Sequence, residues 1–183
     1  MRSDDITAAA WLHYELIGRT GTGSLASLGV SFLERVFYGA NMRNPHFFCD
    51  VAAAEGRLVG FSVYTDDRAR ILNPRMALAT AGFALRCPSS IPVLLYSVNG
   101  EKAPKAAKKI RGQWLVCAIE PEHRSNGVAD SFIQAMERRL RHRCESWLGV
   151  ARLNPPINKL LLRHGAKFIG TGKTQGTTFN YYV

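Results

Sequence analysis

The sequence predicts a single α/β domain in which a mixed central sheet is flanked by helices. Two observations carry this prediction. An apolar, strand-like run at 114–119 leads through a short link into an amphipathic helix, and short strand-like runs alternate with helical patterns elsewhere. A chain of 183 residues buries one sizeable core, and its apolar content of 46% is ordinary for a globular protein.

Two helices and a hairpin are predicted in the first third of the chain. Asp4 or Asp5 is expected to cap the first helix, and a Gly/Thr/Ser loop separates it from the second. Glu55-Gly56 suits a two-residue hairpin turn between two strands. In order, we expect a helix to about residue 18, a helix over 25–38, and strands over Phe47–Ala54 and 57–64.

The segment 66–112 is predicted to be a long helical insertion before the third strand. Residues 68–86 have basic ends and an apolar middle, Pro88 and Pro92 interrupt the pattern, and 102–111 are basic. We expect this segment to cover the sheet or to form a wall of an acceptor site. A helix lying on a membrane surface ranks below these, because the polar face is not continuous.

The turn between the run at 114–119 and the following helix has the features of an anion-binding site. Backbone N–H groups of the turn and of the first helical turn point at one place, where the helix dipole also favours negative charge. Gly127 permits a backbone geometry that other residues resist, and Ala129 leaves room for a phosphate. The remaining elements expected are a helix from Val128, a strand over 147–150, a helix over Pro155–Arg163, and strands over 167–171 and 178–183.

Two motifs resemble those of the GNAT acetyltransferases. The segment 119–129 is similar to that family's acetyl-CoA signature, an apolar strand and an acidic-Pro link followed by [Gln/Arg]-x-x-Gly-x-[Gly/Ala]. The second is Asn154-x-x-Ile157-x-x-Leu160-Leu161-x-x-x-Gly165-x-x-Phe168, which resembles the family's helix beside the cofactor. The resemblance implies one GNAT domain over 1–183, with acetyl-CoA as co-substrate and no metal. The cofactor-binding residues that it implies are Cys117, Ala118, Ile119, Arg124, Ser125, Asn126, Gly127, Val128, Ala129 and Asn154.

The chain differs from the GNAT pattern at the positions that usually supply the acid and the base of acetyl transfer. In the family, a backbone N–H of the cofactor strand, here within 117–119, polarises the thioester carbonyl. The usual proton-handling positions hold Gln113, Gly149 and Leu161 in this chain. We predict Glu120 as the base or as a relay through water, with a surface carboxylate of the Glu-Pro link as the alternative. The other candidates are His123, Tyr96, His164, Tyr181 and Tyr182.

The chain is strongly basic, with a formal net charge of +10 and a pI near 9.8. A basic surface attracts anions, such as a phosphorylated cofactor or a nucleotide-linked substrate. The charges are spread along the chain with few aromatic residues among them, so nucleic acid ranks low as a partner. The four cysteines form no C-x-x-C pair and no metal-ligand spacing, which is typical of buried thiols in a cytoplasmic protein.

Three functions follow from these observations. The leading hypothesis is an N-acetyltransferase that acts on the primary amine of a small molecule, such as an amino sugar or a nucleotide-linked amino sugar. Antibiotic and polyamine acceptors stay open. The alternatives are a non-catalytic acyl-CoA-binding or regulatory domain, and a basic module for nucleic acid or a membrane surface. The sequence predicts neither the oligomeric state nor the acyl length.

Overall fold

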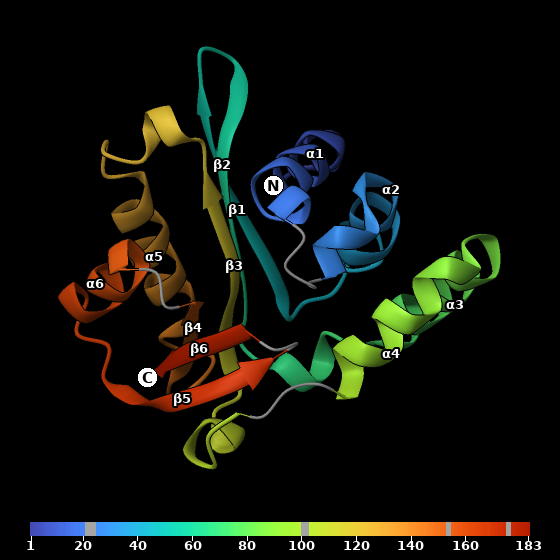
Figure 1. Ribbon diagram of the computed structural model, residues 1–183. Helices are drawn as coiled ribbons and strands as arrows, with labels where there is room; N and C mark the ends of the chain where they lie inside the picture. Colours follow the sequence, from blue (N-terminus) through green and yellow to red (C-terminus); the bar gives the residue numbers. More distant parts are fainter. Residues whose placement is uncertain (21–24, 100–102, 153–154, 175–176) are drawn as a thin grey trace.

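The computed structural model describes residues 1–20, 25–99, 103–152, 155–174 and 177–183. Its centre is a six-stranded sheet in the order β1-β2-β3-β4-β6-β5 (Figure 1). Neighbouring strands are antiparallel except β3 and β4, which are parallel, so the predicted mixed sheet is confirmed. The strands are β1 (Phe47–Ala54), β2 (Arg57–Thr65), β3 (Gly112–Ile119), β4 (Trp147–Arg152), β5 (Phe168–Thr174) and β6 (Thr177–Tyr182).

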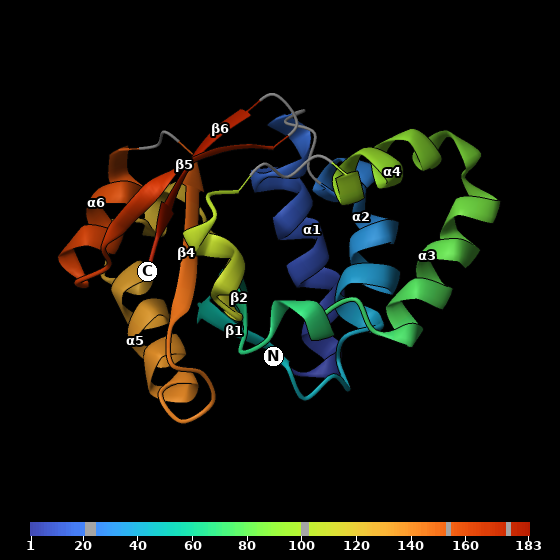
Figure 2. The ribbon, with the colours of Figure 1, turned by 90° about the horizontal axis from the view of Figure 1, so that it is seen from below.

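Helices cover both faces of the sheet. One face carries α1 and α2, the opposite face carries α5 and α6, and α3 and α4 extend outward beyond α2 (Figures 1 and 2). The α-helices are α1 (Ile6–Leu16), α2 (Val30–Phe32), α3 (Pro74–Arg86), α4 (Ile91–Asn99), α5 (Val128–Leu140) and α6 (Pro155–Arg163). The expected helical character of the segment 66–112 is therefore present in α3 and α4.

The second predicted helix, over 25–38, is interrupted. A 3-10 turn, η3 (Leu25–Leu28), ends at Gly29, whose φ of 93° lies outside the right-handed helical region. A new helix starts at Val30 and continues as a π-helix, η4 (Leu33–Gly39). Helical periodicity alone did not reveal this break, because the apolar residues on either side of it face the same core.

The predicted cap of the first helix is also different. A 3-10 turn, η1 (Ser3–Asp5), precedes α1, and the Asp5 side chain makes no hydrogen bond to the N–H groups of the helix. Its Oδ2 instead accepts from the backbone N–H of Arg2 at 2.7 Å. The hairpin turn is as predicted, because Glu55 and Gly56 have φ values of 51° and 77°, which a type I′ turn requires.

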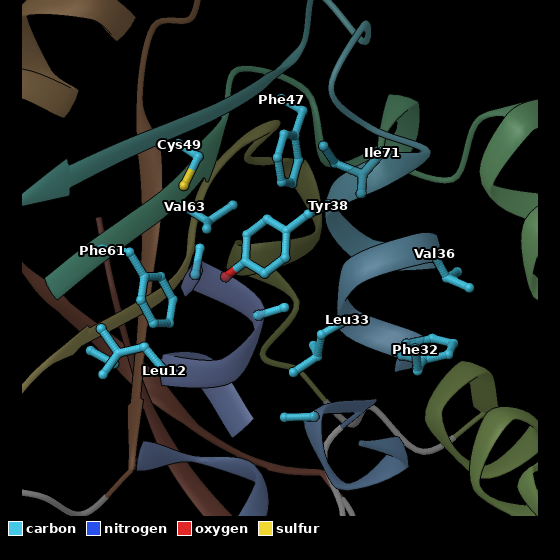
Figure 3. Close-up of a cluster of buried hydrophobic side chains, with 14 of the residues drawn as sticks. Leu12, Phe32, Leu33, Val36, Tyr38, Phe47, Cys49, Phe61, Val63 and Ile71 are labelled. Atoms are coloured by element: carbon cyan, nitrogen blue, oxygen red, sulfur yellow. The ribbon is translucent and has the colours of Figure 1, made fainter. Parts of the chain in front are cut away.

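The largest core lies between the sheet and the layer of α1, α2 and η4. Tyr38 stands at its centre, and its ring makes edge contacts with Phe47 and Phe61 (Figure 3). His13 of α1 is buried in the same core, and its Nδ1 lies 3.1 Å from the Tyr38 hydroxyl. A second core fills the space under α5 and α6, where Ile133, Met136 and Leu161 are fully buried.

The sheet opens between β3 and β4. These strands pair only from Gly112–Trp147 to Trp114–Gly149, and then both continue without pairing to each other. A β-bulge coincides with this point, because Tyr64 pairs with Trp114 and Val63 pairs with Val116, which leaves Leu115 as an extra residue of β3. A bulge increases the local twist of its strand. We conclude that the bulge at Leu115 helps to turn β3 away from β4.

Candidate active site

The edge of β3 that faces the opening presents backbone hydrogen-bonding groups. The Glu120 N–H donates to the Val59 carbonyl at 2.9 Å. In the antiparallel pair β2–β3, this bond determines which residues of β3 direct their backbone N–H and C=O groups toward β2 and which direct them to the other side. Alternate residues, Ala118 among them, therefore turn their N–H and C=O groups to β2. Cys117 and Ile119 turn theirs to the side from which β4 has diverged. The opening thus offers the N–H groups of Cys117 and Ile119 to a ligand.

The turn after β3 continues this row of donors. Gly127 is the N-cap of α5 with φ 73°, and the first bond of the helix runs from the Ser131 N–H to the Gly127 carbonyl at 3.0 Å. The N–H groups of 128–130 therefore have no acceptor within α5. Arg124 fixes the turn to the strand, because its Nε donates to the Ile119 carbonyl at 2.9 Å. An anion bound here would meet free N–H groups and the positive end of the helix dipole.

A carboxylate in the first turn of α5 is paired with side chains from the end of α6 and the residue after it. Asp130 lies in the first turn of α5, where Arg163 Nη2 is 2.6 Å and His164 Nε2 is 2.8 Å from its Oδ1. The hydrogen bond from His164, and then that from Arg163, lower the pKa of Asp130. These contacts limit the repulsion between Asp130 and a bound phosphate. The sequence pattern did not single out Asp130 or Arg163, because only the fold brings α6 to the start of α5.

Nine of the ten expected cofactor residues lie along this strand, turn and helix start. Burial raises the pKa of the Cys117 thiol to about 12, and its side chain packs against the core under α5, so only its backbone is available to a ligand. Asn154 lies outside the described residues. Arg124, Ser125, Asn126 and Gly127 are exposed, Val128, Ala129 and Cys117 are half-buried, and Ala118 and Ile119 are buried.

Two of the three positions at which the resemblance expects proton-handling residues are packed against each other. A Cβ on Gly149 would lie 3.1 Å from the Leu161 side chain, and Leu161 itself is fully buried. Gln113 pairs with Thr65 of β2 and with Leu148 of β4, so it lies in the closed part of the sheet.

Glu120 follows β3 directly and is engaged in an ion pair. Arg57 Nη1 donates to both Glu120 carboxylate oxygens, at 2.5 and 2.7 Å, and His123 Nε2 lies 3.9 Å from Oε2. Three residues at 3.3 Å each place Glu120 about 10 Å along the strand from Cys117. The carboxylate borders a cavity of about 250 Å³ between α1 and the end of β3. The lining residues are Trp11, Leu12, Glu15, Leu16, Arg57, Glu120, Pro121 and Glu122.

The other candidate proton donors are occupied or lie elsewhere. The Tyr182 hydroxyl donates to Asn158 Oδ1 at 2.8 Å, Tyr181 is fully buried, and His164 contacts Asp130. The side chain of Tyr96 is outside the described part of the chain.

A larger cavity of about 440 Å³ lies at the opposite end of β3, where Asp66 and Asp67 are paired with Arg143 and Arg111. This cavity is remote from the turn at 124–127. Among the residues that the structure describes, no group of three or more His, Cys, Asp or Glu side chains is arranged to hold a metal ion.

Comparisons with known proteins agree with this geometry. The model of the acetyltransferase (GNAT) family matches residues 14–166. An N-acetyltransferase from Staphylococcus aureus Mu50 is 13% identical, with a TM-score of 0.64 over 99% of this chain and 96% of that chain.

Two further solved structures share the fold. A ribosomal-protein-alanine N-acetyltransferase from Brucella melitensis has a TM-score of 0.62 at 13% identity, over 100% of this chain and 94% of that chain. A spermidine N-acetyltransferase chimera from Vibrio cholerae has a TM-score of 0.58 at 11% identity, over 100% and 91%. At these identities the likeness shows the fold alone. No curated protein matches the chain in sequence.

Proposed function

Because the chain belongs to the acetyltransferase (GNAT) family and is an acyltransferase, we propose that it transfers an acetyl group from acetyl-CoA to the primary amine of a small molecule. The acceptor that we favour is an amino sugar or a nucleotide-linked amino sugar. The proposed cofactor-binding residues are those of β3, the turn at 124–127 and the start of α5.

The observation that carries the proposal is the set of backbone N–H groups on the open edge of β3, at Cys117 and Ile119, together with those of the first turn of α5. A diphosphate suits the free N–H groups of 128–130, while an extended pantetheine arm suits the open edge of β3. The Cys117 N–H would then donate to the thioester carbonyl oxygen, on which negative charge develops during attack by the amine. A backbone donor fulfils this role without any particular side chain.

Alignment of the two reactants can account for much of the rate. Holding an amine and a thioester in near-attack geometry contributes up to about 7–11 kcal/mol to lowering the barrier. The amine must be uncharged, so the rate should rise with pH as it deprotonates. Glu120 is the proposed base or water relay, although its ion pair with Arg57 must be released for direct proton transfer.

The charge of the chain supports an anionic acceptor. A protein with a net charge of +10 attracts a nucleotide diphosphate and repels a polyamine. The acceptors in the names of the solved structures, a ribosomal protein and spermidine, belong to those proteins and are not transferred to this chain.

Thiol release from acetyl-CoA, measured against a panel of acceptors, tests this function. The panel contains amino sugars, nucleotide-linked amino sugars, polyamines, aminoglycosides and peptides. We expect turnover with the amino sugars and a preference for the nucleotide-linked forms. Tight CoA binding without thiol release across the whole panel would contradict transfer. Turnover confined to peptides or polyamines would contradict the acceptor class alone.

A further inference from the structure

Exposed apolar side chains are concentrated on α3, α4 and the residues beside them. Among the described residues, eight large apolar side chains are exposed, and five of them lie between positions 72 and 95. The most exposed are Leu85 at 83% and Leu78 at 76%. The five residues are Leu72, Leu78, Leu85, Ile91 and Leu95.

This exposed face is separate from the face that joins the two helices to the body. Met76 of α3 is buried, and the Phe83 ring lies 5.2 Å from that of Phe32 in α2. Leu78, Ala81 and Leu85 follow one another at helical spacing and are exposed. The outward position of α3 is visible in Figure 2. Since the inward face already has its core contacts, the outward face is not needed to hold α3 in place.

The charged residues of the segment that carries this face have a single sign. From residue 68 to residue 99 the chain contains four arginines and no aspartate or glutamate. Arg75 and Arg86, in the first and last turns of α3, are exposed and form no ion pair with any described residue. An apolar face with cations at its edges is typical of helices that lie at the surface of an anionic bilayer.

We propose that this face docks on an anionic membrane surface, with Leu78, Leu85 and Leu95 in the boundary between headgroups and acyl chains, and Arg75 and Arg86 at the lipid phosphates. No single helix in the described part of the chain is long and apolar enough to cross a bilayer. Pro74–Arg86 and Pro88–Leu95 reach that hydropathy only together, and they are bent by 119°. Two short helices in this arrangement suit a position along the surface. The sequence pattern alone places a membrane surface below a role as sheet cover or acceptor wall; the exposure of the leucines on α3 favours the membrane surface instead.

A second copy of the chain fits this face less well. In a two-fold contact the same patch faces itself, so arginines of one protomer approach those of the other. The segment 68–99 holds no carboxylate that could pair with them across such a contact. Lipid phosphates supply the missing negative charge.

Co-sedimentation of the full chain with vesicles tests the proposal. We expect the partition coefficient for vesicles of phosphatidylcholine with 30% phosphatidylglycerol to exceed that for pure phosphatidylcholine by about tenfold or more. Raising the salt concentration should lower it. The double variant Leu78→Ser/Leu85→Ser should weaken the partition coefficient by about tenfold or more, because two apolar contacts are lost. Arg75→Gln and Arg86→Gln should each weaken it by about fivefold.

Leu162→Ser is the matched control, because Leu162 of α6 is 54% exposed and lies outside this face. Each variant is checked by its unfolding transition. The proposal is overturned if the wild type does not sediment with anionic vesicles, or if the Leu162 variant loses binding as strongly as the double variant. Light scattering that shows a wild-type dimer and a monomeric double variant, without vesicle binding, would assign the face to a second copy instead.

Discussion

At the scale of single residues, Gly127 joins backbone geometry to cofactor binding. A Cβ on Gly127 would meet no protein atom within 4 Å, so the space beside it is free for a ligand. We predict that Gly127→Val lowers CoA affinity at least about fivefold by filling that space. Arg124→Ala should have a smaller effect, through lost charge and the lost bond to Ile119. Calorimetric titration with CoA measures both.

Gly56→Val is the control for backbone strain. Gly56 has φ 77°, close to the 73° of Gly127, and a Cβ there would also meet no atom within 4 Å. Both substitutions force a β-branched residue into the left-handed region at a cost of about 1–2 kcal/mol. Only Gly127→Val should change CoA binding. Equal affinities for the two folded variants would contradict the assignment of the turn.

Glu120→Gln separates the two roles of this carboxylate. Removal of a general base lowers the turnover rate by roughly 10²–10⁴-fold and leaves CoA affinity nearly unchanged. Because Glu120 is the proposed base or relay, Glu120→Gln should give this loss. A change of less than about threefold would mean that the ion pair with Arg57, about 10 Å along the strand from Cys117, keeps the carboxylate out of the reaction. Steady-state kinetics with the best acceptor decides this. A loss of 100-fold or more would establish Glu120 as the base or relay.

His13 makes stability depend on pH. Burial lowers its pKa from 6.5 to about 4, so the unfolded chain binds its proton more readily between these values. The unprotonated His13 therefore stabilises the folded state fully above about pH 6.5, and this stabilisation is lost as the pH falls towards 4. We expect His13→Asn to remove about 2 kcal/mol of the stability difference between pH 7 and pH 5, measured by urea unfolding. An unchanged difference would show that other groups cause it.

At the scale of elements, the bulge in β3 is flanked by a buried side-chain bond. Trp114 Nε1 donates to Ser62 Oγ at 2.8 Å, across β3 and β2. Ser62→Ala leaves the indole N–H without an acceptor, and we predict a loss of about 1–3 kcal/mol in the free energy of unfolding. In the double variant with Trp114→Phe, the total loss should be smaller than the sum of the two single losses. Strict additivity would mean that this bond does not stabilise the region.

The elements differ in how far sequence predicts them. α6 was predicted with its exact bounds because proline begins it and the apolar pattern ends at Arg163. The turn before α5 was predicted because glycine and small residues follow a strand after a short acidic-Pro link. The bulge at Leu115 has no local signal, since it depends on how β2 and β4 pair with β3. The same holds for the pairing of Glu120 with Arg57, which are 63 residues apart.

At the scale of the whole molecule, β3 contacts the helix layers on both faces of the sheet. It packs against α1 on one face and against α5 on the other, and its open edge lies between these layers (Figure 1). The cavity beside Asp66 and Arg143 lies at the closed end of the sheet, and the donor row lies at the open end. A ligand in the opening would therefore protect backbone amides of β3 and of the turn, and leave α3 unchanged.

Residue-resolved hydrogen exchange of the full chain, with and without acetyl-CoA, tests this account most directly. We predict that acetyl-CoA slows exchange at the amides of Cys117 and Ile119 and at 128–130. The Ala118 amide, which bonds to β2, should be protected in both states. Exchange at Cys117 that is already slow in the free protein, or that does not change while amides near Arg143 become protected, would contradict the proposed position of the cofactor.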